Sequence, residues 1–268
     1  MKKFSSLFID EMNRSKSYFL GVLSFMLGGE TLMVLLRVFH MANLFRRGEL
    51  VEAGDLASFT LTGWNNLIYG GVFLALALYT VLIWQRDWEG KGRLVYRLMT
   101  YPGSRLTVAL AKWATILTMV FALLGIQLIY MAALNHLLNG LLPNELYRFA
   151  PYYTYFTHDW SFMNLFLPFN GYDFIASYSL GSAAILVIFN SILIYYCERA
   201  NGFIIMLLKL FIFLVLTAAL AVGYVWLMAS ILYPLGLEIF YLLLLGALVL
   251  ITFNILLLNY RLNHRLYC

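Results

Sequence analysis

The sequence predicts an all-α, polytopic membrane protein with six transmembrane helices. Apolar residues make up 63% of the chain and charged residues 12%, whereas soluble domains have roughly 45–50% and about 25%. The apolar residues gather in runs that, at about 1.5 Å per helical residue, can each cross a hydrocarbon core of about 30 Å. These runs cover residues 18–39, 60–84, 106–138, 172–197, 203–228 and 239–260.

Lysine and arginine predict the orientation of these spans. With both termini inside, the inner segments carry twelve Lys and Arg residues and the outer loops carry three. Cytoplasmic loops are enriched in these cations, so residues 85–105 and both ends of the chain are predicted to be cytoplasmic. The formal net charge of +5 is therefore interpreted as a topology and lipid-headgroup signal, not as nucleic-acid binding.

The regions outside the spans have distinct compositions. Residues 1–17 place Phe4, Leu7, Phe8 and Met12 on one side of a helix, which predicts an amphipathic interfacial helix. Residues 41–59 are expected to form a polar loop. Residues 139–171 are rich in aromatic side chains, which favours an outer cap at the membrane–water interface over a substrate-binding aromatic site.

Residues 85–105 contain a second amphipathic pattern. Leu94, Val95, Leu98 and Met99 recur at helical spacing, with polar residues between them. Flexible glycines precede this turn and Pro102–Gly103 ends it. The pattern predicts a short cytosolic helix between the second and third spans, with an apolar face available to a partner.

This segment resembles a known family. Glu89, the following glycine, the Leu-rich turn, a Pro-x-Ser-Arg motif and Ala111–Lys112 are similar to the loop between the second and third membrane helices of ABC-2-type transporter permeases. The resemblance implies a coupling helix that docks into a cleft of a separate ATPase subunit. The ATPase-coupling residues it implies are Glu89, Arg93, Leu94, Val95, Arg97, Leu98 and Met99.

The resemblance also implies a function. The chain would be the non-catalytic permease subunit of an ATP-driven exporter in a prokaryotic plasma membrane, and residues 1–17 would be its "elbow" helix. A second permease subunit, identical or related, and an ABC ATPase subunit would be its partners. ATP and Mg would be bound by the ATPase partner, so no cofactor is expected in this chain.

The residues themselves are consistent with a non-catalytic chain. Gly90-Lys91-Gly92 lacks the upstream glycine and the following Ser or Thr of a phosphate-binding loop. Neither GxSxG nor HExxH occurs, and no Cys/His spacing predicts a metal site. Cys197 and Cys268 are not expected to form a structural disulfide, because both lie at predicted cytoplasmic span ends.

Polar residues inside the spans are the remaining candidates for a site. Glu30 and Arg37 are seven residues apart and face one side of the first span, about 10 Å apart along its axis. We favour pairing of these two with each other or with a neighbouring helix, and keep a water-filled route lined by Glu30 as the alternative. Gln127, Asn65, Asn66, Asn190 and Asn254 are expected to form interhelical hydrogen bonds, and Lys209 to reach the inner interface.

Two other functional classes are weighed against the permease. A secondary transporter usually has more spans, an inverted repeat and broken midplane helices, none of which the sequence displays. An intramembrane enzyme needs several ionisable groups at one depth, and only Glu30 and Arg37 are candidates for such a set. Recovery of a soluble ATPase with the chain would separate these three classes.

Overall fold

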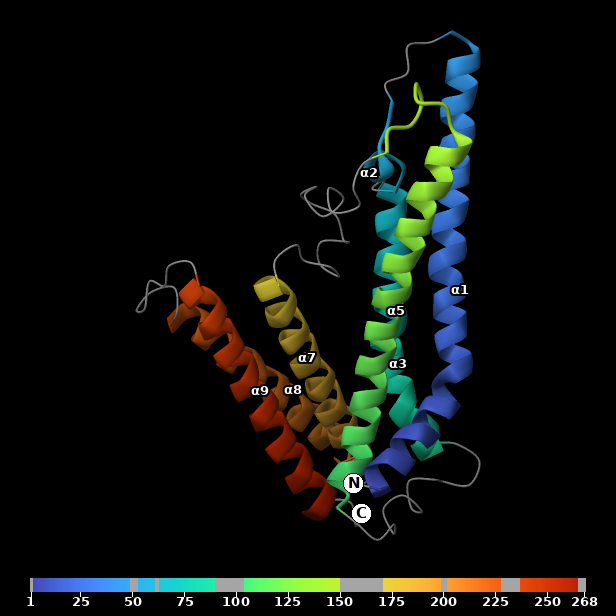
Figure 1. Ribbon diagram of the computed structural model, residues 1–268. Coiled ribbons are helices and arrows are strands. Elements are labelled where there is room, and N and C mark those ends of the chain that lie inside the picture. Colours follow the sequence, from blue (N-terminus) through green and yellow to red (C-terminus); the bar gives the residue numbers. More distant parts are fainter. Residues whose placement is uncertain are drawn as a thin grey trace. The chain divides into compact units, whose positions relative to one another are not determined.

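The computed structural model describes residues 2–48, 53–60, 63–89, 104–149, 171–198, 202–227 and 237–264. Six helices in these ranges are long and apolar enough to cross a membrane, so the chain is an all-helical, multi-pass membrane protein (Figure 1). The helices are α1 (Lys2–Arg46), α2 (Leu56–Thr60), α3 (Gly63–Glu89), α5 (Leu106–Leu141), α7 (Gly171–Glu198), α8 (Phe203–Leu227) and α9 (Leu237–His264).

The helices form two compact units. Unit A contains Asn13–Leu76 and Thr118–Gly171. Unit B contains Met1–Met12, Ala77–Leu117 and Tyr172–Cys268. Helices α1, α3 and α5 contribute residues to both units, since each continues past a boundary between them.

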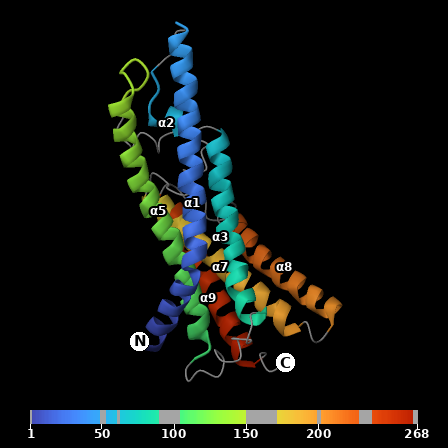
Figure 2. The ribbon, with the colours of Figure 1, turned by 90° about the vertical axis from the view of Figure 1, so that its right-hand side faces the viewer.

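In unit A, α1, α3 and α5 run side by side (Figures 1 and 2). Their apolar core contains Val22 and Met26 of α1, Val72 and Leu76 of α3 and Leu123 of α5. Helices α1 and α3 approach closely at Gly29, where a Cβ atom would lie 3.1 Å from the Ile68 side chain. Small residues allow such close approach of membrane helices.

The ends of α1 and α5 in unit A differ from the expected loops. Residues 41–59 were expected to form a polar loop, but α1 continues to Arg46 and α2 begins at Leu56. The side chain of Asp55 accepts a hydrogen bond from the Ser58 amide at 2.9 Å. This contact satisfies a donor in the first turn of α2, which explains why the short helix begins there.

Tyr147 packs between α2 and α5 at this end of unit A. Its hydroxyl donates to Asn135 Oδ1 at 2.5 Å, and its ring packs edge-on against Phe59. The backbone of Arg148 donates to the Gly54 carbonyl at 2.9 Å. Burial, and to a lesser degree the nearby Asp55 carboxylate, raise the pKa of Tyr147 to about 12. The hydroxyl therefore stays protonated and keeps its donor role.

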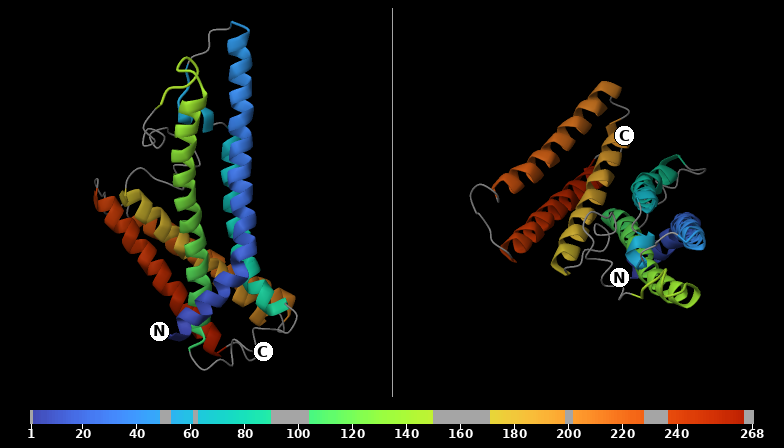
Figure 3. Two further views of the ribbon diagram at one scale, coloured as in Figure 1. Left: turned by 45° about the vertical axis from the view of Figure 1, so that its right-hand side comes forward. Right: turned by 90° about the horizontal axis from the view of Figure 1, so that it is seen from above.

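In unit B, α7, α8 and α9 pack against one another (Figure 3). Asn190 of α7 donates to the backbone and side-chain oxygens of Asn254 on α9, both at 3.0 Å. An interhelical hydrogen bond was predicted for each of these residues, and the structure shows that they bond to each other. The Tyr224 hydroxyl of α8 donates to the Leu242 carbonyl of α9. Gly202, directly before α8, has φ 109°, a backbone conformation that glycine adopts without steric cost.

Candidate functional site: buried charges at the helix ends of unit B

Several helix ends meet in unit B. The guanidinium of Arg105, just before α5, donates to the Leu262 carbonyl near the end of α9 at 2.9 Å. Leu7 of α1 is buried in a cluster with Val108 and Ala111 of α5. The start of α1, the start of α5 and the end of α9 therefore lie together.

Lys112 is the centre of the site. Its side chain is fully buried, although it carries a cation. Its ammonium group donates to Asp87 Oδ2 at 2.5 Å, to Glu11 Oε1 at 2.8 Å and to the Ile83 carbonyl at 3.1 Å. The ammonium also lies 5.4 Å from the centre of the Trp84 ring, at a distance where a cation is attracted to an aromatic face.

Arg86 completes the ion network. One of its terminal nitrogens lies 2.5 Å from Glu11 Oε2, so Glu11 binds both cations. The two cations and two carboxylates balance in charge, which offsets the high cost of removing each from water. Glu11 comes from α1, Arg86 and Asp87 from α3, and Lys112 from α5, so the network ties three helices together.

Helix α7 is joined to the same end of α3. The Tyr196 hydroxyl donates to Glu89 Oε1 at 3.1 Å, and the Tyr196 and Trp88 rings stack with centroids 4.6 Å apart. About one helical turn before Trp88 on α3, Trp84 packs edge-on against Phe189 of α7. These contacts join the end of α3 to α7, as the ion network joins it to α1 and α5.

The predicted coupling helix is bracketed by this network. Arg93, Leu94, Val95, Arg97, Leu98 and Met99 lie outside the described residues, and Glu89 is the last residue of α3. Asp87 precedes the segment and Lys112 follows it, so their ion pair joins its two ends. In the sequence, Lys112 stands out only as part of the Ala111–Lys112 motif, and no local pattern links it to Glu11 or Asp87. The sequence signal that could have indicated a buried site was a single lysine, Lys112, within a predicted membrane span.

The predicted interfacial helix is part of α1, which continues from Lys2 to Arg46. Leu7 is buried against α5, and Phe8 packs at the edge of the same cluster. Phe4 is exposed, and Met12 is partly buried. The four residues predicted for one lipid-facing side therefore differ in environment, and Leu7 contacts protein.

A second buried polar cluster lies in unit A and includes the predicted candidates Glu30 and Gln127. Glu30 is completely buried. Its carboxylate accepts from the Tyr69 hydroxyl at 2.9 Å and from Gln127 Nε2 at 2.6 Å. No ion pair joins Glu30 to Arg37, whose Nε is buried without a hydrogen-bond partner among the described residues. Glu30 is thus held by neighbouring helices, one of the two arrangements expected for it.

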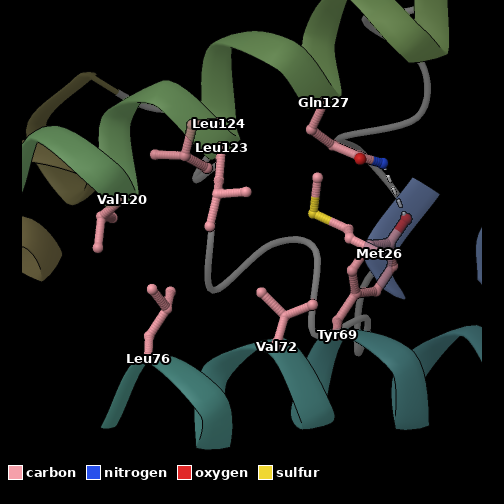
Figure 4. Close-up of a pocket in the computed structure, with 8 residues that line it drawn as sticks. All are labelled: Met26, Tyr69, Val72, Leu76, Val120, Leu123, Leu124 and Gln127. Atoms are coloured by element: carbon pink, nitrogen blue, oxygen red, sulfur yellow. Dashed lines mark hydrogen bonds between the residues drawn. The ribbon is translucent and has the colours of Figure 1, made fainter. Parts of the chain in front are cut away.

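A small cavity adjoins this cluster (Figure 4). Its volume is about 20 Å³, and Tyr69 and Gln127 face each other at its polar end. The rest of the lining is apolar and comes from α1, α3 and α5: Met26, Val72, Leu76, Val120, Leu123 and Leu124. This is room for about one water molecule, far less than a small-molecule site needs.

Within the described ranges, no group of three or more His, Cys, Asp or Glu residues could hold a metal ion. Comparisons with protein-family models, with curated proteins and with solved structures find no match. The fold defines the class of the molecule: a multi-pass membrane protein, with six helices among the described residues that are long and apolar enough to cross a membrane.

Proposed function

We propose that this chain is the membrane-spanning permease subunit of an ATP-driven ABC exporter of the ABC-2 type. The observation that carries the proposal is the buried Lys112 network, because it connects the two ends of residues 90–103 to α1, α3 and α5. A segment that transmits force needs a stiff connection to the spans, and a balanced buried ion network supplies one.

The network favours concerted movement of the helix ends. Separating Lys112 from Asp87 or Glu11 would leave a buried charge without its partner, at a cost of about 3–5 kcal/mol. A push on residues 90–103 would therefore be passed to the ends of α1, α3 and α5 together. Through Glu89 and Trp88, which contact Tyr196, the same push would reach α7.

The partners follow from this mechanism. An ABC ATPase subunit would cover the apolar face of Leu94, Val95, Leu98 and Met99 and would hold ATP and Mg. A second permease subunit, together with membrane lipid, would cover exposed apolar side chains such as Ile204, Phe211 and Val222 of α8, which are 66–80% exposed. The complex would reside in the plasma membrane with both termini of this chain inside.

The test is ATP hydrolysis that co-purifies with the tagged chain in mild detergent. Leu98→Asp and Val95→Asp each place a charge on the proposed contact face, and loss of one apolar anchor with burial of its charge should cost about 2–4 kcal/mol of association. Co-purifying ATPase activity should fall in both variants. Expression and membrane insertion should not change, because the spans are untouched.

Glu145→Ala is the matched control, since Glu145 is exposed beyond the end of α5 on the predicted outer face. It should retain the ATPase activity of the unmodified chain. Equal activity with all three variants, or no ATP hydrolysis with the unmodified chain, would rule out the coupling-helix assignment.

A further inference from the structure

A second, larger cavity lies in unit B between α7, α8 and α9. Its volume is about 300 Å³, which reaches the range of roughly 300–1,000 Å³ found for small-molecule sites. It takes no part in the Lys112 network. Its lining changes from charged at one end to apolar at the other.

The charged end lies where α7 ends, α8 begins and α9 nears its end. Lys209 of α8 pairs with Glu198 of α7, with Nζ and Oε2 2.5 Å apart. Arg261 of α9 donates to the Asn190 carbonyl at 3.0 Å and lies over the Phe213 ring, 5.0 Å from its centre. Arg261 therefore brings a second cation to this end of the cavity.

The net charge of this end favours an anion. Among the described residues that line the cavity, Lys209 and Arg261 are the cations and Glu198 is the one carboxylate, which gives these residues a net charge of +1. The Lys209 side chain is 39% exposed, whereas that of Glu198 is 7% exposed. The ammonium group is therefore the more accessible member of the pair.

The other end is apolar. Phe253 and Leu257 of α9 line the cavity together with Ile212 and Leu216 of α8. From Arg261 to Phe253 is eight residues, so the apolar wall extends about 12 Å along α9 from the charged end. Ile212 is 55% exposed and Leu216 48% exposed, so the cavity opens at the apolar surface of α8.

We propose that this cavity binds an anionic phospholipid. The phosphate lies against Arg261 and Lys209, and part of one acyl chain lies along Ile212, Leu216 and Phe253. Basic pockets between membrane helices at headgroup level suit anionic lipids, and this one joins such a pocket to an apolar wall open to the side. The inference does not depend on the proposed transport function.

The test uses native mass spectrometry of the full chain purified in detergent. The protein is titrated with phosphatidylglycerol, with phosphatidylcholine of the same acyl chains, and with inorganic phosphate. One net positive charge near a membrane surface corresponds to about a fivefold preference, so phosphatidylglycerol should bind about fivefold more tightly than phosphatidylcholine. Inorganic phosphate should not displace it at matched concentration, because it lacks the acyl chain.

Two variants of the charged end should change binding in opposite directions. Arg261→Gln lowers the net charge to zero and should weaken phosphatidylglycerol binding about fivefold, while Arg261→Lys should retain it. Glu198→Gln releases Lys209 from its carboxylate and should strengthen binding by a similar factor. A folding defect would weaken binding in every variant, so a gain with Glu198→Gln separates recognition from stability.

Lys16→Gln is the matched control, because it removes an exposed cation from unit A and should leave lipid binding unchanged. Equal affinity for the two lipids, or a loss of affinity with Glu198→Gln, would overturn the proposal. Displacement of the lipid by inorganic phosphate would show a simple anion site instead. A dimer whose formation excludes lipid would assign the cavity to a subunit interface.

Discussion

Lys112 Nζ lies 2.5 Å from Asp87 Oδ2, although the two residues are 25 positions apart in the sequence. Both side chains are buried, with exposed fractions of 0% and 1%. The pair therefore holds the end of α3 to the first turns of α5. The two helices cannot separate there without exposing a charge or leaving it buried without its partner. Glu11 adds the start of α1 to the same contact.

Lys112→Met should strongly destabilise the protein. The substitution would leave Glu11 and Asp87 buried without this cation, at a cost of about 3–5 kcal/mol. Thermal unfolding in detergent should shift to a lower midpoint. The double variant Lys112→Met with Asp87→Leu, which removes the ion pair altogether, should recover part of the loss. Lys16→Met, at an exposed position of α1, is the control, and an equal midpoint for Lys112→Met and the control would contradict the structure.

Gly246→Ala should weaken the packing of α8 against α9. A Cβ atom at this position would lie 2.5 Å from the Tyr224 ring, and the Tyr224 hydroxyl is held by its hydrogen bond to the Leu242 carbonyl. The ring must move and strain that bond, at a cost of about 1–3 kcal/mol. The midpoint of thermal unfolding should fall.

Gly223→Ala is the matched control for this substitution, because no atom lies within 4 Å of its added Cβ. There the exchange should leave stability unchanged or raise it by up to about 1 kcal/mol, the helix preference of alanine over glycine. Equal loss of stability in the two variants would mean that α8 and α9 do not pack as observed.

The spans could be predicted from the sequence because they depend on local composition. Residues 203–228 were expected to span the membrane, and α8 covers Phe203–Leu227. The third span was predicted to begin at about residue 106, and α5 begins at Leu106. Hydropathy locates such segments well because every backbone group in lipid must be bonded within its own helix.

The polar clusters were less predictable because they depend on tertiary contacts. Glu30 and Arg37 share a helix face, yet Glu30 is bonded to Tyr69 and Gln127, which are 39 and 97 positions away. Periodicity indicates which side of a helix a residue faces but not which helix it meets there. For the same reason Lys112 could not be paired with Glu11, 101 positions away.

Glu30→Leu should destabilise unit A, whereas Glu30→Gln should have less effect. Leucine removes the acceptor of both the Tyr69 hydroxyl and the Gln127 amide, although Gln127 Nε2 keeps its 3.2 Å hydrogen bond to the Tyr69 hydroxyl. Loss of this buried acceptor should cost about 1–3 kcal/mol. Glutamine keeps an acceptor of similar shape. The midpoint of thermal unfolding in detergent measures both effects, and a leucine variant as stable as the unmodified protein would show that the cluster has no structural role.

The predicted topology can be measured by single-cysteine labelling of intact cells. In a Cys197→Ser, Cys268→Ser background, Tyr153→Cys should react with a membrane-impermeant maleimide and Arg97→Cys should not, because the excess of Lys and Arg predicts that residues 85–105 lie inside. Both positions should react after the cells are permeabilised. The reverse pattern in intact cells would invert the assigned orientation and remove residues 85–105 from the reach of a cytosolic ATPase.

Leu7→Asp separates two roles of the first turns of α1. Leu7 is 7% exposed against Val108 and Ala111, whereas Ile9, two residues on, is 53% exposed. If packing against protein dominates, Leu7→Asp should lower the free energy of unfolding by about 2–3 kcal/mol through lost apolar burial. It should also leave an unpaired charge beside α5. Ile9→Asp should then leave the thermal midpoint of the detergent-purified protein almost unchanged. In membranes, where the exposed side of these turns is predicted to lie on lipid, Ile9→Asp should reduce assembly as well. Equal midpoints for the two variants in detergent would mean that Leu7 does not pack on α5, and that this part of α1 is held by lipid alone.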